Sequence, residues 1–352
     1  MASDLEQLDL ANLNQWMKDH SLSGSWMRVG VDAEGRPQSR PASNVSGSGA
    51  YVTRWADLYP SLLRGGELVS LPYGPMEMRT AGGQPAGAPN RPITMNAQIL
   101  MPGERTRAHK NSKNETRLVV DAPAEAVFVC DGEAFPMQRG DVVISPTWTD
   151  HDHFNPGSKP AVWIDVYDWG YSGLGAELNE RFSPDDPYQK ITRTDGYSEK
   201  TLGQLGPASG RSTSPRPPVR YPWAGTEAAL TALRENEEEE DPYEGFQLMF
   251  RSPVDGGPTL PTIAWHVQML PGRRTTRTHR HNSTAFYHVF QGEGVTVVEG
   301  ERLEWTQGDI FLVPPWTWHS HQNLASEDAI LFSVDDWPAR KALGFYGEER
   351  LP

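Results

Sequence analysis

The chain has 352 residues, a length that fits two domains, and its formal net charge of −14 argues against a nucleic acid or an anionic membrane as partner. Cys130 is the only cysteine, so a disulfide framework is excluded, and no apolar run approaches the roughly 20 residues that span a bilayer. Because the N-terminus is acidic and amphipathic rather than a secretory signal, we expect a soluble, cytoplasmic protein.

Residues 1–92 are predicted to form an N-terminal extension of helices and loops. Apolar residues recur at helical spacing in "LEQLDLANLNQWMKDH", which begins at Leu5. A second, shorter helix is predicted in "TRWADLYPSLLRG", with an interruption at Pro60 because proline removes a helical hydrogen bond. Residues 74–92 are rich in Gly, Pro and Ala and are expected to form a loop.

Short strands are predicted at 93–172 and again at 245–335. Stretches such as "ITMNAQILM" and "AVWIDVYDW" alternate in polarity, and turn signals such as Pro102-Gly103 separate them. Many short, evenly spaced strands are typical of a small barrel or jelly roll. The fold class is therefore expected to be β-dominated, with one barrel in each region.

The segment 173–244 is predicted to link the two barrels. It holds a Gly/Pro/Ser-rich stretch at 202–222 and then a helix at 225–235. The acidic run from Glu235 to Asp241 is interpreted as a solvated helix end rather than a binding site. Residues 336–352 are expected to form a C-terminal tail.

The two strand-rich regions are copies of one another. "MPGERTRAH" in the first matches "LPGRRTTRTH" in the second, and "RGDVVISPTWTDHDHFN" matches "QGDIFLVPPWTWHSHQN" 168 residues later. Gln98 and Gln268 each precede the first histidine of their copy by the same spacing. So many matched positions predict a duplicated β domain of about 90 residues.

The second copy carries three histidines in a pattern that predicts a metal site. His279 and His281 are two residues apart, so on a strand their side chains share a face. His319 follows at the end of a later strand. Three imidazoles that converge in a small barrel leave coordination positions open, which suits Fe(II), Mn(II), Ni(II) or Cu(II).

The first copy has an altered set of candidate ligands. His109 and His151 are present, but Asn111 stands between them where the second copy has His281. Glu115 has the same strand parity as His109 and could face the same interior. Either these residues form a two-histidine, one-carboxylate site that suits non-haem iron, or this copy has lost its metal.

The motifs that run from Gly103 to Glu115 and from Gly140 to Asn155 resemble the two cupin motifs. With "GGPTLPTI" and "FYHVFQGEG" as well, residues 60–335 resemble the gentisate 1,2-dioxygenase family of bicupins, which includes salicylate, nitrosalicylate and 1-hydroxy-2-naphthoate dioxygenases. The resemblance implies two tandem jelly-roll barrels, an Fe(II) cofactor, and O2-dependent cleavage of a hydroxybenzoate ring between the carboxyl-bearing and hydroxyl-bearing carbons. It also implies a small aromatic carboxylic acid as substrate and a dimer or tetramer as assembly.

By position, the resemblance assigns substrate-binding roles in the first copy. Arg117 would pair with the substrate carboxylate, His153 would act as acid or base, and Gln98 would orient the ring. Asp165, or its neighbour Asp168, would hold His153 in one tautomer. The family's iron in the first cupin would be held by His109, Asn111 or Glu115, and His151.

Two departures leave the catalytic copy undecided from the sequence. Asn111 replaces the middle iron-binding histidine of the first cupin, and Tyr287 stands in the second cupin where the first has Arg117. If the second cupin is catalytic, the substrate groups would be Gln268, Tyr287, His321 and Arg277. A different cupin oxygenase, or a decarboxylase with a glutamate ligand, is the alternative enzyme, and a non-enzymatic bicupin is a third alternative. Phe286 and Tyr287 stand where the decarboxylase glutamate would fall.

Overall fold

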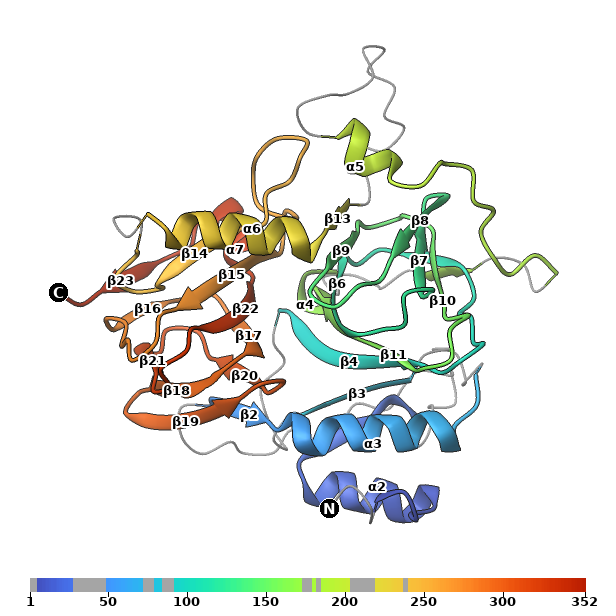
Figure 1. The fold of residues 1–352 in the computed structure, drawn as a ribbon, viewed down its shortest axis with the longest axis horizontal. Coiled ribbons are helices and arrows are strands. Elements are labelled where there is room, and N and C mark those ends of the chain that lie inside the picture. The colour runs from blue at the N-terminus through green and yellow to red at the C-terminus, as the bar shows by residue number, and fades with distance from the viewer. Residues whose placement is uncertain are drawn as a thin grey trace.

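The structure is a computed structural model that describes residues 5–27, 49–71, 79–83, 92–172, 179–181, 185–202, 219–236 and 240–352. Two β-barrels lie side by side, the first in green and cyan and the second in orange and red (Figure 1). Each barrel is built from two antiparallel sheets. The expected pair of jelly-roll barrels is therefore confirmed. Among the described helices, none is long and apolar enough to cross a membrane.

The first barrel consists of a seven-stranded and a five-stranded sheet. The seven-stranded sheet has the order β1 (Leu22–Gly24), β3 (Arg79–Gly83), β4 (Thr94–Leu100), β11 (Ala161–Tyr167), β6 (Glu115–Asp121), β9 (Val142–Ser145) and β13 (Val219–Tyr221). The five-stranded sheet has the order β12 (Asn179–Arg181), β5 (His109–Asn111), β10 (His151–Phe154), β7 (Val127–Cys130) and β8 (Glu133–Pro136). The strand expected from "ITMNAQILM" is β4, and that from "AVWIDVYDW" is β11.

The second barrel repeats this plan with a six-stranded and a five-stranded sheet. The six-stranded sheet has the order β14 (Phe246–Met249), β15 (Ala264–Leu270), β22 (Ala329–Asp335), β17 (Ala285–Gln291), β20 (Ile310–Val313) and β2 (Tyr51–Thr53). The five-stranded sheet has the order β19 (Glu301–Thr306), β18 (Glu293–Val298), β21 (His319–Asn323), β16 (His279–His281) and β23 (Glu348–Arg350). The C-terminal tail thus supplies the strand beside the histidine pair.

Each barrel contains one strand that comes from the chain segment directly before the other barrel. Strand β2, from the N-terminal extension, pairs with β20, and β13, from the linker, pairs with β9. A tryptophan follows each strand, and its backbone N–H donates to an aspartate of the receiving barrel: Trp55 to Asp309 at 2.8 Å and Trp223 to Asp141 at 2.9 Å. The two halves of the chain are therefore interlocked rather than joined by one linker.

The structure corrects three details of the sequence prediction, one in a helix and two in strands. Helix α3 (Trp55–Leu68) runs through Pro60 without a break, because Leu58 and Leu62 on either side of the proline are buried in the core. Residues 79–83, expected in a loop, form β3, and residues 219–221, expected in the linker, form β13. The predicted helices at Leu5 and at 225–235 correspond to α2 (Leu10–Asp19) and α6 (Trp223–Arg234). The remaining short helices are η1 (Ser25–Met27), α4 (Trp169–Ser172), α5 (Tyr197–Thr201) and α7 (Trp337–Ala342).

The largest hydrophobic cluster lies between the barrels and is shared by the large sheets of both. It joins Leu118 and Ile164 of the first barrel to Trp265 and Phe286 of the second, and α2 and α3 pack against it. Trp265 also donates a hydrogen bond from Nε1 to Thr116 Oγ1 across this interface, at 2.7 Å. Smaller apolar clusters fill each barrel interior, so the polar groups inside the barrels stand out as exceptions.

Candidate active site

Each barrel interior contains one group of side chains that could hold a metal ion. The groups are His279, His281 and His319 in the second barrel and His109, Glu115 and His151 in the first, and the ligand atoms within each group all lie within 4.8 Å of one another. Both predicted groups therefore come together in space. In the register of the sheets, His279 is directly opposite His319, and His109 is directly opposite His151.

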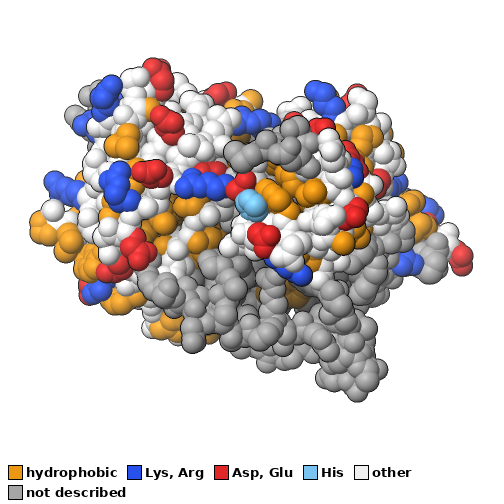
Figure 2. Space-filling model, turned by 90° about the horizontal axis from the view of Figure 1, so that it is seen from below, with side chains coloured by type: hydrophobic (Ala, Val, Ile, Leu, Met, Phe, Trp, Pro, Cys, Tyr) orange, Lys and Arg blue, Asp and Glu red, His pale blue; other side chains and the backbone are white. Residues whose placement is uncertain are grey.

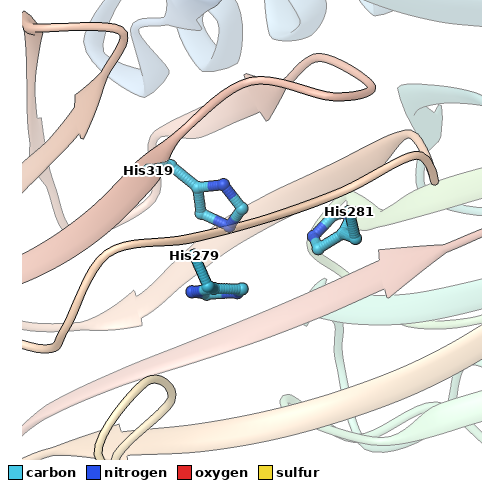
Figure 3. Close-up of side chains that lie close together, drawn as sticks. All are labelled: His279, His281 and His319. Carbon is cyan, nitrogen blue, oxygen red and sulfur yellow. The ribbon is translucent and has the colours of Figure 1, made fainter. Parts of the chain in front are cut away.

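Backbone carbonyls orient two of the three histidines of the second barrel, whereas Nδ1 of His279 has no hydrogen-bond partner among the described residues. The ring of His319 has Nδ1 3.0 Å from Thr317 O, and that of His281 has Nδ1 3.2 Å from Ser283 O and 2.8 Å from Ser283 Oγ. These contacts leave Nε2 for a metal, which is the usual arrangement of metal-binding imidazoles. The Nε2 atom of His319 is buried and has no hydrogen-bond partner among the described residues. Figure 3 shows the rings of His279 and His319 close together and tilted, with His281 beside them; the ring centres of the first two are 4.2 Å apart.

Electrostatics favours neutral imidazoles at two of these three positions. Burial, with the charge of His279, lowers the pKa of His281 and holds that of His319 well below its ordinary value. His279 differs, because Glu244 lies 3.0 Å from its Nε2 atom and raises its pKa despite burial. Burial would raise the pKa of Glu244, but His279 lowers it to about 2.

The first barrel holds its carboxylate in a dense network of charged groups. Glu115 Oε2 lies 2.5 Å from Arg117 Nη2 and 3.0 Å from His151 Nε2, and Glu115 Oε1 lies 3.2 Å from Lys113 Nζ. Burial opposes its charge, but these positive groups hold the pKa of Glu115 well below its ordinary value. The cluster thus neutralises this carboxylate with protein cations.

Asn111 is engaged in the same network. Its amide Nδ2 donates to Glu115 Oε1 at 2.8 Å, and its Oδ1 accepts from the backbone N–H of Lys113 at 3.2 Å. The side chain therefore ties the strand β5 to the buried glutamate.

Two of the other residues expected at the first-barrel site, Arg117 and Asp165, already have protein partners, whereas Nε2 of His153 is buried without one among the described residues. Arg117 donates to Ser145 at 2.8 Å, and its Nε lies 3.2 Å from Asp165 Oδ1. Asp165 accepts a hydrogen bond from Trp163 at 3.0 Å and lies beside Arg117 rather than His153. The partner of His153 Nδ1 is instead Thr106 Oγ1, at 3.4 Å. Asp168, the second candidate for holding His153, accepts hydrogen bonds from Asn114 and Thr262.

Gln98 and Gln268 occupy the same position in the two barrels, on β4 and β15. Each is fully buried, and neither its amide oxygen nor its amide nitrogen has a hydrogen-bond partner among the described residues. Buried polar atoms without partners are costly, so they indicate groups that wait for a ligand or water.

The remaining second-barrel candidates divide into interior and surface residues. His321 is buried, with Nδ1 2.9 Å from Thr296 Oγ1 and Nε2 unpartnered, and burial lowers its pKa to about 4. Tyr287 stacks on Phe311 with 4.7 Å between ring centres and lies 5.0 Å from the ring of His321. Arg277, however, is exposed on the surface.

Sequence reasoning missed Glu244 and His266. Glu244 precedes β14 and lies outside both repeated motifs, and His266 shares the inward parity of Gln268 on β15, with Nδ1 3.7 Å from Asp335 Oδ2. Burial lowers the pKa of His266 to about 4. The alternation of β15 could have identified His266, since it stands two residues before Gln268.

Comparisons with known proteins identify the family. The cupin domain family matches residues 96–167 and 265–335. The chain is 31% identical to 5-aminosalicylate 1,2-dioxygenase of Comamonas sp over 357 residues, which cover 99% of this chain and 92% of that protein. The chain belongs to the gentisate 1,2-dioxygenase family of bicupins. This membership confirms the resemblance of the motifs and makes the chain a ring-cleaving dioxygenase.

Other relatives agree with this placement. Gentisate 1,2-dioxygenase of Haloferax sp is 32% identical over 87% of this chain and 89% of its own length. The crystal structure of a mutant salicylate 1,2-dioxygenase from Pseudoaminobacter salicylatoxidans in complex with gentisate superposes with a TM-score of 0.77 and 29% identity, over 86% of this chain and 85% of that one. The two-barrel architecture is thus shared with a solved dioxygenase of the family.

Proposed function

We propose that the protein uses Fe(II), held by His279, His281 and His319 in the second barrel, to cleave a hydroxybenzoate ring with O2. The observation that carries this proposal is the convergence of three imidazoles whose ligand atoms lie within 4.8 Å of one another. From residue 240 onward no lysine or arginine is buried, in contrast to the first barrel, where Lys113 and Arg117 are buried. Bound in the second barrel, the iron would supply the redox chemistry that joins O2 to the ring.

The first barrel fits a divalent ion less well. Lys113 and Arg117 already neutralise Glu115, and two buried positive charges would repel an added cation. Asp165 compensates these charges only in part at neutral pH, because burial raises its pKa to about 7. We therefore assign the first barrel a structural role.

The substrate proposed is a salicylate-type acid with its hydroxyl group beside its carboxylate. Relatives act on 5-aminosalicylate and gentisate, both of which carry a hydrogen-bond donor at the ring position opposite the hydroxyl group. In the second barrel, Gln268 and His321 offer buried, unpartnered polar atoms for such a ring. Because burial holds the pKa of His321 at about 4, it stays neutral and can accept or donate one hydrogen bond.

The lack of a buried cation in the second barrel favours some ring substituents over others. A 5-amino or 5-hydroxy group needs only acceptors, whereas an added anionic group such as a 5-sulfonate would need a positive partner. We expect 5-aminosalicylate and gentisate to be turned over with a kcat/KM at least about tenfold above that of 5-sulfosalicylate, about 1.4 kcal/mol in transition-state binding.

The test is O2 uptake and ring-opening absorbance with this substrate panel on the wild type, His319→Ala and His109→Ala. Loss of turnover in His319→Ala, with turnover retained in His109→Ala, is the expected result. The reverse pattern would assign the chemistry to the first barrel and overturn the proposal. Absence of O2 uptake with every member of the panel would overturn the substrate class.

A further inference from the structure

Glu244 reaches the second metal site from outside the repeated motifs. Its Oε1 atom lies 3.0 Å from His279 Nε2, the atom that would face the metal. Its other oxygen, Oε2, is buried and has no hydrogen-bond partner among the described residues. Its ion-pair partner within 4 Å in the described part of the chain is His279 alone. A carboxylate in this position is expensive to bury unless it binds a cation.

The backbone around Glu244 is built to hold the side chain in place. Asp241 and Gly245 exchange backbone hydrogen bonds of 2.9 and 2.8 Å, and Asp241 Oδ1 accepts from the backbone N–H of Glu244 at 3.2 Å. Gly245 has φ +74°, and a Cβ there would lie 2.6 Å from Met269 O, so this turn requires glycine. The hydroxyl of Tyr243 donates to Leu351 O at 2.7 Å and anchors the same turn to the C-terminal tail.

We propose that Glu244 is a fourth metal-binding residue of the second barrel, beside the three histidines. Two donor atoms that each lie about 2.1 Å from an ion, at about 90° to one another, are about 3.0 Å apart. The separation of 3.0 Å between Glu244 Oε1 and His279 Nε2 matches that spacing for this pair. Glu244 is not in the group of residues whose ligand atoms all lie within 4.8 Å of one another, so binding would draw its carboxylate toward His281 and His319. The carboxylate also brings one negative charge to the site, which reduces the cost of burying a dication.

Comparison with the first barrel shows why Glu244 and not Glu115 is suited to this role. Glu115 Oε2 lies at the same distance, 3.0 Å, from His151 Nε2. Glu115 is neutralised by Lys113 and Arg117, whereas Glu244 has no protein cation of that kind within 4 Å in the described part of the chain. The two carboxylates come from different places in the repeat, so a motif search would not align them.

This inference rests on the proposed function, because it requires the ion to be in the second barrel. With four protein donors, a six-coordinate ion keeps two positions open. A substrate that binds through two oxygens would, together with O2, need three positions. Either the carboxylate would therefore have to leave the ion, or the substrate would have to bind through one oxygen. The test is therefore carried out on the resting protein, without substrate.

The experiment is an anaerobic titration of metal-free protein with Co2+, followed by visible absorbance, on the wild type, Glu244→Gln, Glu240→Gln and His281→Ala. Glu240 is a charge-matched control close in sequence to Glu244, because its ion-pair partner is Arg274 rather than a histidine of the site. We expect Glu244→Gln to weaken Co2+ binding about 10- to 100-fold and to change the spectrum. Glu240→Gln should change affinity less than about threefold, and His281→Ala should remove high-affinity binding.

Wild-type affinity and an unchanged spectrum in Glu244→Gln, with binding lost in His281→Ala, would overturn the role of Glu244 and leave the proposed function standing. Unchanged binding in His281→Ala would instead overturn the proposed function. If Glu244→Gln does not fold, as judged by circular dichroism, Glu244→Asp replaces it. That variant keeps the charge but shortens the reach, and wild-type affinity in it together with an unchanged spectrum would also contradict the proposal.

Discussion

Arg117 and Glu115 form a buried ion pair of 2.5 Å in the first barrel, at the place where a metal ion would otherwise be held. In the second barrel the same two positions are Tyr287 and Ala285, which carry no charge. The duplicated barrels have thus diverged in opposite directions. The first interior contains an ion-paired cluster with buried Lys113 and Arg117, and the second contains three imidazoles and no buried lysine or arginine.

Arg117→Met should destabilise the protein strongly without lowering turnover. Removing one partner of a buried pair leaves an uncompensated charge, which costs about 3–5 kcal/mol. Chemical denaturation of Arg117→Met and of Arg280→Met, a partly exposed control on β16, gives the two costs. We expect about 1 kcal/mol or less for the control. A kcat that falls more than about tenfold in folded Arg117→Met would contradict the structural role of the first barrel.

The free energy of unfolding should depend on Asp165 in weakly acidic to neutral solution. Burial raises its pKa in the folded protein to about 7, against about 3.9 in the unfolded chain. The folded state therefore keeps a proton that the unfolded state releases, so stability is lost as pH rises from about 4 to about 7, by at most about 4 kcal/mol.

Asp165→Asn should remove this loss and flatten the pH dependence in that window. Urea unfolding between about pH 5 and about pH 8 measures it, with Asp121→Asn, an exposed residue at the end of β6, as the matched control. The same slope in Asp165→Asn and the wild type would show that Asp165 is ionised throughout this range.

The glutamines at equivalent positions offer a paired test of which barrel binds substrate. Gln268→Leu should raise KM about tenfold or more, because it removes a hydrogen bond of about 1.5 kcal/mol to a charged ligand. Gln98→Leu should leave KM within about twofold. Steady-state O2 uptake with 5-aminosalicylate distinguishes them, and a larger effect of Gln98→Leu would place the substrate in the first barrel.

Metal binding should stabilise the second barrel in a way that His281→Ala abolishes. At a free Co2+ concentration of 100 times the dissociation constant, a ligand that binds only the folded state adds about 2.7 kcal/mol. Thermal unfolding with and without Co2+ should shift in the wild type and in His151→Ala. A shift of the wild-type size in His281→Ala would indicate that the ion binds elsewhere.

Much of the fold could be predicted because the repeat and the strand alternation are local signals. The exchange of β2 and β13 between barrels was missed, because strand pairing at long range leaves no local pattern. A weak signal was present: Trp55-Ala56 and Trp223-Ala224 are themselves 168 residues apart, the same offset as the Trp-rich histidine motifs. The repeat therefore begins before the barrels and includes the exchanged strands.

The convergence of the histidines was predictable, because two-residue spacing on a strand places their side chains on a common face. Whether the first barrel binds substrate was not predictable, since Arg117 could have paired either with a substrate or with Glu115. Only the contacts of Arg117 with Glu115, Asp165 and Ser145 decide between these alternatives. Glu244 was missed for a similar reason, because its turn is set by Asp241 and Gly245 rather than by a motif. On the face shown in Figure 2, acidic and basic side chains are interspersed, so their charges give no guide to the site there.

The most direct test of the account is the iron content per chain of anaerobically purified wild type, His151→Ala and His281→Ala, measured beside folded-state spectra. The account predicts one iron per chain in the wild type and in His151→Ala, and none in His281→Ala. Iron that is retained in His281→Ala and lost in His151→Ala would place the metal with Glu115 in the first barrel and contradict the assignment.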